Sequence, residues 1–522
     1  MTTQPDKKNF RENNILKLTE DLQNILTPIG IQASNDTLYK GAVFGRDSLR
    51  VAEDLIDHYP NISKRIIFSL ASHQGMSEHL ESEEELGRIH HEYRSCFLGQ
   101  EQIEIKQRKI MERLAENWGW LVPNHELCYY GSVDATPQYV RLIFDYINKT
   151  HDKNFLNQKY RHHNGKIITI HKSLLLALGW IEKRLDNSTI GLLEFQRKHE
   201  KGHPWQVMRD GLLSYAHPNG QLVNMNKPVA SLEVQGLTYD ALIGAVEILG
   251  LEFPHKKDKW LKLANKLQEK VLKLFWIKKD NFFAMAIDRN PKNNAIRQVK
   301  TISSVPAELL ETRIFDSLSL EIKNKYIHAI VEKMYSDEFL TQAGIRSWSI
   351  KHTNIFKEEI WNYHGVHTVW GVTANVFAKG LHKQGFNILA EDMENRLINA
   401  CGTSGSSQEF FYVDSHGKIA YKILKSKNKK DNKETPIIKG VNIPEKTQAW
   451  TVSALLRANL AKKVNQKKIT FFEKEISNRI TLEHRRSHEE LANTFANSNI
   501  FILDSNEAIK AKGRIFEKNR PR

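Results

Sequence analysis

Five acidic residues stand in loops that also contain aromatic residues and glycine, a setting that suits acid and base chemistry. These residues are Asp47, Asp134, Asp210, Glu233 and Glu409. Glycoside hydrolysis needs one carboxylic acid to protonate the leaving oxygen and one carboxylate to attack or to activate water. Sugar sites also combine aromatic plates with carboxylates and amides. The aromatic residues of the same loops are Trp205, Tyr215, Tyr363, Trp370, Phe411 and Tyr412.

Each of these acids also has a purely structural interpretation. Asp47 or Asp134 could be a helix N-cap, and Glu233 could pair with an arginine. Asp210 and Glu409 could simply face water. Other chemistries lack their motifs, because the sequence contains no GxxxxGK[ST], GxGxxG, HExxH, CxxC pair or GxSxG. We therefore predict no cofactor and no metal site.

Helices dominate the elements that must position these residues. Segments with apolar residues at i, i+3, i+4 and i+7 predict helices. They cover residues 16–29, 48–58, 102–118, 137–149, 167–185, 237–249, 259–275, 318–334, 372–382, 385–400 and 447–460. Strand-like alternation is confined to 281–287 and 410–423, the second broken by an Asp-Ser-His-Gly turn typical of a hairpin. No repeat of fixed period is visible, so uneven helix pairs favour a closed helical barrel over a solenoid.

Composition and charge indicate a globular protein without a nucleic-acid or membrane partner. Of 522 residues, 40% are apolar and 26% are charged, which excludes a disordered chain. The formal net charge is +15, but the basic residues are scattered rather than gathered on one helical face. Three cysteines favour a reducing compartment, and the polar start has no apolar segment behind it. We expect a soluble cytoplasmic protein.

Six motifs in one order carry a resemblance to a known family. They are FGRDSL (44–49), EEELGRIHHEYR (83–94), YYGSVDATP (129–137), LEVQGLTYDAL (232–242), QEFFYV (408–413) and QAW (448–450). The chain resembles the bacterial amylo-alpha-1,6-glucosidase, or glycogen-debranching-like, glycoside hydrolases of the six-hairpin glycosidase superfamily. The resemblance implies a mainly α fold, an (α/α)6 barrel with short β-hairpins in its loops and an active site at the end where the loops gather.

The resemblance also implies roles for individual residues. Asp210 matches the general acid of relatives and Glu409 the general base. Arg46 and Asp47 match residues that grip the sugar. Further predicted substrate-binding residues are Asp134, Trp205, Glu233, Gln235, His364 and Trp370.

The chain departs from its relatives in two of these loops. Relatives often read WKDS or WMDS where this chain has Met208 to Gly211, and YHxGSVWP where it has YHGVHTVWG.

From these features we predict a glycosidase that cleaves an α-glucosidic, including α-1,6, linkage of a storage or compatible-solute saccharide with inversion. The alternatives are hydrolysis of a small glycoside of the mannosylglycerate or trehalose type, and a catalytically inactive saccharide-binding protein. The partner is an oligosaccharide or a small glycoside, and the sequence does not indicate an oligomeric state. We expect an N-terminal helical extension packed on the barrel (1–40), a catalytic barrel (41–463) and a C-terminal appendage with a basic tail (464–522).

Overall fold

Helices are the main secondary structure of the described residues, with short strands between them, as predicted. The computed structural model describes residues 7–27, 30–34, 39–95, 101–118, 126–152, 154–211, 213–353, 355, 363–420, 425–427, 434–436, 444–461, 472, 474 and 476. The predicted C-terminal appendage lies outside the described residues, apart from the last three positions of that list. None of the helices over these ranges combines the length and the apolar composition that crossing a bilayer requires.

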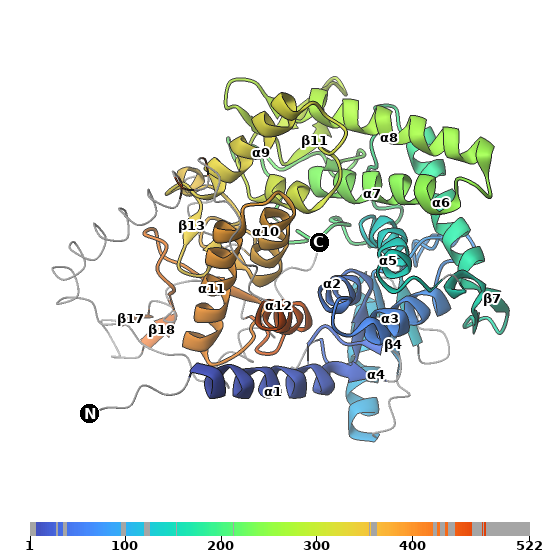
Figure 1. The fold of residues 1–522 in the computed structure, drawn as a ribbon, viewed down its shortest axis with the longest axis horizontal. Coiled ribbons are helices and arrows are strands. Elements are labelled where there is room, and N and C mark those ends of the chain that lie inside the picture. The colour runs from blue at the N-terminus through green and yellow to red at the C-terminus, as the bar shows by residue number, and fades with distance from the viewer. Residues whose placement is uncertain are drawn as a thin grey trace.

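Among the described residues, five helices and one 3-10 helix contact each other in a closed order around the middle of the molecule (Figure 1). The order is α2, α5, α7, η3, α10, α12 and back to α2. We call these elements the ring. Their bounds are α2 (Gly45–Leu55), α5 (Ala135–Thr150), α7 (Leu232–Leu249), η3 (Val305–Glu311), α10 (Gly371–Lys383) and α12 (Ala449–Leu460). Every residue of α2 is buried, because a helix at the centre of a protein has neighbours on all sides.

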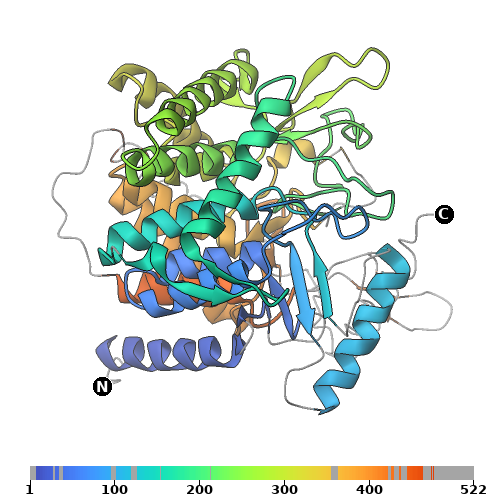
Figure 2. The same ribbon diagram turned by 90° about the vertical axis from the view of Figure 1, so that its right-hand side faces the viewer.

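A second set of helices alternates with the ring along the chain and packs on it. These are α1 (Lys7–Ile25), α3 (Pro60–Ser72), α6 (Ile170–Asn187), α8 (Pro254–Leu274), α9 (Leu320–Met334) and α11 (Asn387–Ser404). They bury one face only. In α8 the buried residues include Trp260, Ala264, Leu267 and Val271, which recur at helical spacing. α4 (Glu101–Trp118) contacts β4 and stands to one side of the helices in Figure 2.

Short strands lie directly before three of the ring helices and set where those helices begin. β3 precedes α2, β8 precedes α7 and β15 precedes α10. Their antiparallel partners give the sheet orders β3-β4-β5, β12-β11-β8 and β15-β16. The strands drawn in blue and cyan stand to the right of the helices in Figure 2, so the ring helices start from that end. The bounds are β3 (Ala42–Phe44), β4 (Glu92–Ser95), β5 (Glu126–Tyr129), β8 (Ala230–Ser231), β11 (Ala286–Arg289), β12 (Ile296–Val299), β15 (Thr368–Trp370) and β16 (Phe410–Tyr412).

The remaining strands form small antiparallel pairs in loops. They are β1 (Leu26–Thr27), β2 (Gly30–Ile31), β6 (Lys159–Arg161), β7 (Ile167–Thr169), β9 (Trp276–Ile277), β10 (Phe282–Phe283), β13 (Leu340–Thr341), β14 (Gly344–Ile345), β17 (Lys425–Lys427) and β18 (Glu434–Pro436). The hairpin predicted at 410–423 is present, since Val413 bridges Ile419 across the expected turn. Its first strand, β16, also pairs with β15, which places Thr368 opposite Tyr412.

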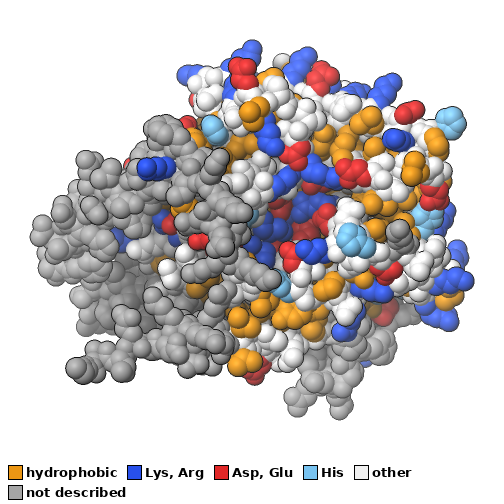
Figure 3. All heavy atoms as spheres, viewed as in Figure 1, with side chains coloured by type: hydrophobic (Ala, Val, Ile, Leu, Met, Phe, Trp, Pro, Cys, Tyr) orange, Lys and Arg blue, Asp and Glu red, His pale blue; other side chains and the backbone are white. Residues whose placement is uncertain are grey.

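A network of buried ion pairs joins the ring elements along their carboxyl halves. Arg50 of α2 pairs with Glu311 of η3, and Lys379 of α10 lies 3.4 Å from the same carboxylate. Arg141 of α5 lies 2.8 Å from Glu53 of α2. Burial opposes the ionisation of Glu311, but Arg141 and Arg50 outweigh it and hold the pKa of this carboxyl below its ordinary value. Figure 3 shows acidic and basic side chains gathered in a hollow at the middle of the face seen in Figure 1.

The contact between α5 and α7 depends on a glycine, and this gives a stability prediction. A Cβ at Gly244 of α7 would lie 2.2 Å from Cδ2 of Phe144, a buried ring of α5 that has no room to move. Gly244→Ala should therefore destabilise the protein by ~1 to 3 kcal/mol, the usual cost of overpacking a core. Gly179→Ala in α6 is the matched control, because nothing lies within 4 Å of its added Cβ.

The control should instead stabilise the protein by ~0.5 to 1 kcal/mol, since alanine is the better helix former. Urea unfolding of the two variants measures both effects. If Gly244→Ala and Gly179→Ala had equal free energies of unfolding, the contact between α5 and α7 would have room for a methyl group, and the overpacking argument would be wrong.

Candidate active site

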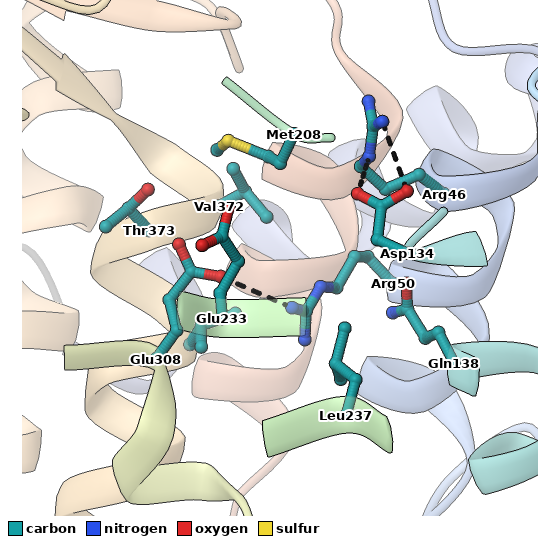
Figure 4. A pocket seen from close by; sticks show the side chains of 11 residues that line it. Arg46, Arg50, Asp134, Gln138, Met208, Glu233, Leu237, Glu308, Val372 and Thr373 are labelled. Carbon is teal, nitrogen blue, oxygen red and sulfur yellow. Dashed lines mark hydrogen bonds and ion pairs between the residues drawn. The ribbon is translucent and has the colours of Figure 1, made fainter. Parts of the chain in front are cut away.

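The predicted site residues come from separate segments that meet where the ring helices begin. Arg46 and Asp47 stand in the first turn of α2, and Glu233 in the first turn of α7. A pocket at this end is lined by Arg46, Asp134, Met208 and Glu233, with Arg50 and Glu308 deeper along the axis (Figure 4). Three of the predicted site residues, Arg46, Asp134 and Glu233, thus line one pocket.

Arg46 and Asp134 form the most completely paired contact of this pocket. Nε of Arg46 lies 2.5 Å from Oδ2 of Asp134, and Nη2 donates to Oδ1 over 3.2 Å, as the dashed lines of Figure 4 show. The hydroxyl of Ser132 also donates to Oδ1. Both partners are buried, which makes a two-pronged charged contact strong. Asp134 occupies the N-cap position of α5, but its side chain makes no capping hydrogen bond.

Asp47 lies in the first turn of α2 and is not its N-cap. The N-cap of α2 is Phe44, without a side-chain capping bond. Asp47 is 5% exposed and its Oδ1 accepts from Nε2 of Gln448 over 3.0 Å. Burial raises the pKa of Asp47 to about 7, and the negative charge of Asp210 adds to the rise against the opposing charge of Arg46. An acid that titrates near neutrality inside a pocket is typical of functional sites.

The raised pKa of Asp47 predicts a pH-dependent gain of stability on replacement. The folded protein holds this proton up to about pH 7, whereas the unfolded chain releases it near pH ~3.9. The unfolded state binds fewer protons between these values, so this group lowers stability as the pH rises through the window. Asp47→Asn removes the ionisation. The stability of this variant relative to wild type should therefore increase by ~3 kcal/mol between pH 4.5 and pH 8.

Urea unfolding at the two pH values measures this change. Asp186→Asn is the control, because Asp186 is a half-exposed aspartate of α6 for which no such gain is expected. A difference between Asp47→Asn and wild type that does not vary with pH would contradict the burial argument.

Asp210 lies beside Arg46 and is partly exposed, with 28% of its side chain accessible to solvent. Nη1 of Arg46 lies 3.8 Å from its Oδ2, and Nε2 of His364 lies 4.0 Å from its Oδ1. Burial raises the pKa of Asp210 against the positive charges of His203 and Arg46. A carboxyl with a raised pKa keeps its proton toward neutral pH, as a general acid must.

Arg209, the residue before Asp210, holds this loop in place through two buried glutamates. Nη1 of Arg209 lies 2.9 Å from Oε1 of Glu308 and 3.7 Å from Oε1 of Glu233. Burial raises the pKa of Glu233 to about 7, and Glu308 adds to the rise while Arg209 opposes it. Glu233 also accepts from the hydroxyls of Ser231 and Tyr215. Glu233 is thus paired with an arginine, as its structural interpretation expected, and it still lines the pocket.

Glu409 is buried and does not face water. The residue is 4% exposed and stands immediately before β16. The hydroxyl of Tyr363 donates to its Oε1 over 2.6 Å, and the backbone N–H of Glu445 donates to its Oε2 over 3.3 Å. Donors on both oxygens favour the ionised carboxylate, the form that a base needs.

Two tyrosines show that Asp210 and Glu409 lie in the same part of the molecule. Tyr39 and Tyr363 have pKa values well above the ordinary one because of burial, and in both the charges of Glu409 and Asp210 add to the rise. Such coupling requires both carboxylates to be near each hydroxyl. The structure therefore brings the two predicted catalytic carboxylates together around Tyr39 and Tyr363.

An aromatic wall flanks these carboxylates. The rings of His364 and Trp370 stack with centroids 4.4 Å apart and planes 13° apart. Both ring nitrogens of His364 are buried without a hydrogen-bond partner, and burial lowers its pKa well below the ordinary value. Within the part of the chain that the structure describes, a neutral imidazole without hydrogen-bond partners thus lies beside Asp210. The apolar cluster around Trp370 also contains Met208, Val372, Val376, Phe410, Tyr412 and Trp450.

Two predicted site residues are buried and make their contacts within the protein. Trp205 is fully buried, with its ring against Tyr215 at 5.4 Å. Gln235 donates to the carbonyls of Leu193 and Ser231 and accepts from the N–H of Leu193, so its amide ties the loop before α7 to that helix. Neither residue is among those that line the pocket.

The structure adds residues that the sequence did not single out as site residues. Tyr363 precedes His364 in a loop already noted for its chemistry, and Gln448 begins the QAW motif. His203 is the first of the charges that lower the pKa of Asp210, and its Nδ1 lies 2.6 Å from the carbonyl oxygen of Trp205. Tyr39 falls in the segment assigned to the N-terminal extension. No group of three or more His, Cys, Asp or Glu residues within the described ranges is placed to hold a metal ion.

Comparisons with known proteins agree with the resemblance that the motifs carry. A family model described as amylo-alpha-1,6-glucosidase matches residues 106–330. This segment contains Asp134, Asp210 and Glu233 and ends before Glu409. No curated protein matches the chain.

Solved structures with a similar fold include glycoside hydrolases. The GH63 mannosylglycerate hydrolase from Thermus thermophilus in complex with glucose has a TM-score of 0.53 and 13% identity, over 85% of this chain and 98% of that chain. The same enzyme in complex with Tris and D-glycerate has a TM-score of 0.53 and 13% identity, over 85% and 99%. An uncharacterized conserved protein from the same organism has a TM-score of 0.52 and 11% identity, over 85% and 99%. The family match and the shared fold support a glycosidase.

Proposed function

Because the chain is similar to the amylo-alpha-1,6-glucosidase family and folds like GH63 glycosidases, we propose that it hydrolyses an α-glucosidic linkage with inversion at the anomeric carbon. The substrate is a storage or compatible-solute saccharide, and the linkage class includes α-1,6. The observation that carries this proposal is the contrast between the two central carboxyls. Burial favours the protonated form of Asp210, whereas hydrogen-bond donors on both oxygens favour the ionised form of Glu409.

In this mechanism Asp210 donates its proton to the glycosidic oxygen while the bond to the anomeric carbon breaks. Glu409 takes a proton from a water molecule, whose oxygen attacks that carbon from the opposite face. One proton leaves Asp210 and one arrives at Glu409, so the enzyme regains its starting state by exchange with solvent. Attack from the opposite face gives a β product from an α-linked substrate.

The other pocket residues support a role in holding the sugar. Nη1 of Arg46 can donate to a hydroxyl, since Asp134 accepts from Nε and Nη2. Asp47, held by Gln448, is placed to accept from a hydroxyl. The stacked pair of His364 and Trp370 can cover an apolar sugar face.

The ring and the helices packed on it support an (α/α)6 barrel as the architecture of this enzyme, with residues 41–463 as its catalytic unit. The closed order of contacts is the reason for this part of the proposal. The extension predicted at 1–40 would then contribute to catalysis as well, because Tyr39 is coupled to both catalytic carboxylates.

A small anionic glycoside is the second candidate substrate. The similar GH63 structures are of a mannosylglycerate hydrolase, one of them in complex with D-glycerate, and this chain carries a net charge of +15. A positively charged protein attracts an anionic substrate, and salt screens that attraction. KM for mannosylglycerate should therefore rise with ionic strength, whereas KM for a neutral glucan should not.

A substrate panel tests the proposed function. Isomaltose, trehalose, glycogen and mannosylglycerate are each incubated with the protein, and proton NMR identifies the anomer that is released first. Release of β-glucose from an α-linked substrate is the expected result. Release of the α anomer would contradict inversion, and tight binding of a saccharide without any release would favour the inactive binding protein instead.

A further inference from the structure

We propose that Tyr363 is the positioning residue of Glu409, and that it fixes both the orientation and the ionisation of this carboxylate. The proposal rests on the proposed role of Glu409 as the base. The Tyr363 hydroxyl donates to Oε1 of Glu409 over 2.6 Å, a length typical of a hydrogen bond to a charged oxygen. Since the N–H of Glu445 holds the other oxygen, the carboxylate has one donor on each side.

The ring of Tyr363 is itself held in place. Its edge meets Trp370 with centroids 4.7 Å apart and planes at 87°, and Phe410 at 5.3 Å and 86°. The indole N–H of Trp370 donates to the backbone carbonyl of Tyr363 over 2.9 Å. These contacts fix the ring from two sides and the backbone from a third. The hydroxyl therefore reaches Glu409 without the entropic cost of ordering a mobile side chain.

The backbone under Glu409 is equally fixed. The N–H of Glu409 donates to the carbonyl of Glu445 over 2.9 Å, so the two residues are joined in both directions. The side chain of Glu445 accepts from the hydroxyl of Ser34 over 3.0 Å. A base held at its backbone and at both carboxylate oxygens has little freedom to turn.

Tyr363 also touches the loop of the acid. A Cβ built on Gly211, the residue after Asp210, would lie 3.3 Å from Cβ of Tyr363 and 3.4 Å from Cδ2 of His364. The loop that carries Asp210 therefore packs directly on Tyr363. The two segments can approach this closely because Gly211 has no side chain. The titratable groups near the pair include, among the described residues, Tyr39, Asp210, His364 and Glu445.

The test is Tyr363→Phe, which removes one oxygen and keeps the ring. We expect kcat to fall by ~10-fold or more while KM changes little, because the base is misoriented but the sugar contacts remain. The acidic limb of the kcat/KM profile reports the base, and loss of a donor to its charged form should move that limb upward by ~1 pH unit. Tyr326→Phe is the matched control, since Tyr326 is a buried tyrosine of α9 in an aromatic cluster remote from the pocket. It should leave kcat and the profile unchanged.

A second measurement separates this inference from the proposed function. The chain is labelled with glutamate carrying 13C at the side-chain carboxyl, and the Glu409 signal is identified by its loss in Glu409→Gln. Titration of that signal should give a higher pKa in Tyr363→Phe than in wild type, whether or not any glycoside is cleaved.

The outcomes are distinct. If wild type cleaves glycosides but Tyr363→Phe keeps both the acidic limb and the pKa of Glu409, the positioning role is overturned and the proposed function stands. If wild type cleaves no glycoside, the proposed function fails, and the NMR titration still decides whether Tyr363 sets the ionisation of Glu409. A lowered thermal stability with an unchanged profile would assign Tyr363 a packing role and overturn the proposal.

Discussion

Replacement of Glu409 by glutamine is expected to lower kcat by ~10⁴-fold on every substrate, the upper end of what a single acid or base contributes. Glutamine keeps the shape of the side chain and can still accept from Tyr363. It cannot take a proton from water, and that step is needed whatever the leaving group is. Turnover of both a natural saccharide and a glycosyl fluoride measures the effect, and both should be lost together.

The matched control for this variant is Glu182→Gln. Glu182 is a buried glutamate of α6 that accepts from the indole N–H of Trp260 over 2.8 Å, so it also bonds to an aromatic side chain. It lies outside the pocket, and the control should change thermal stability but not kcat. If Glu409→Gln retained a tenth of wild-type turnover, the base would have to be another residue.

Replacement of Asp210 by asparagine should have an effect that depends on the leaving group. We expect a loss of ~10²-fold or more in kcat on natural saccharides, because the departing oxygen needs a proton. A glycosyl fluoride leaves without that proton, so its hydrolysis should stay within ~10-fold of wild type. The ratio of the two losses is the measurement, and it distinguishes an acid from a residue that only binds the sugar.

Asp392→Asn is the control for Asp210, since Asp392 is similarly exposed, at 32%, on α11 and pairs with Arg396 away from the pocket. The basic limb of the kcat/KM profile should also disappear in Asp210→Asn, because ionisation of the acid no longer matters. Equal losses on the fluoride and on the saccharide would remove Asp210 from the acid role.

The helices could be predicted because their burial follows a simple period. The segment predicted at 102–118 is α4 (Glu101–Trp118), and that predicted at 137–149 lies within α5 (Ala135–Thr150). α3 (Pro60–Ser72) is missing from the prediction. Its signals were a proline at the first helical position and buried Ile66, Ile67 and Leu70. The prediction also missed the first turns of α7 and α2, which begin at Leu232 and Gly45. Residues there are buried on all faces of the helix, so apolar residues do not recur at helical spacing.

The site was harder to predict, because the type of a residue does not show whether its side chain lines a pocket or packs in the core. Trp205 and Gln235 have the types that sugar pockets use, but both are fully buried, and the amide of Gln235 bonds to the backbone. Tyr363 has the same type as many core tyrosines, and only the position of Glu409 across the chain gives it a partner. A contact between two segments far apart in sequence cannot be predicted from the spacing of residues within either segment.

The two loops that depart from the family patterns meet in space. Gly211 takes the place of the serine that relatives often have after the acid, and a Cβ there would approach both Tyr363 and His364. The other motif, YHGVHTVWG, begins with those two residues, and its departure from the family pattern follows them. The absence of a side chain in one loop thus makes room for the other loop. Arg209, in the first of them, replaces an apolar or lysine residue with a guanidinium that reaches Glu308.

The helices of the ring all begin at the pocket, and this parallel arrangement imposes an electric field. The amino end of each helix carries about half a positive charge, so α2, α5, α7, α10 and α12 together direct positive potential at the pocket. The transition state of glycoside hydrolysis carries positive charge on the sugar ring, and this field would oppose it. Each ionised carboxylate at this end, such as Glu409, opposes that field. A glycosidase built on this scaffold therefore needs a surplus of carboxylates in its loops, whichever sugar it cleaves.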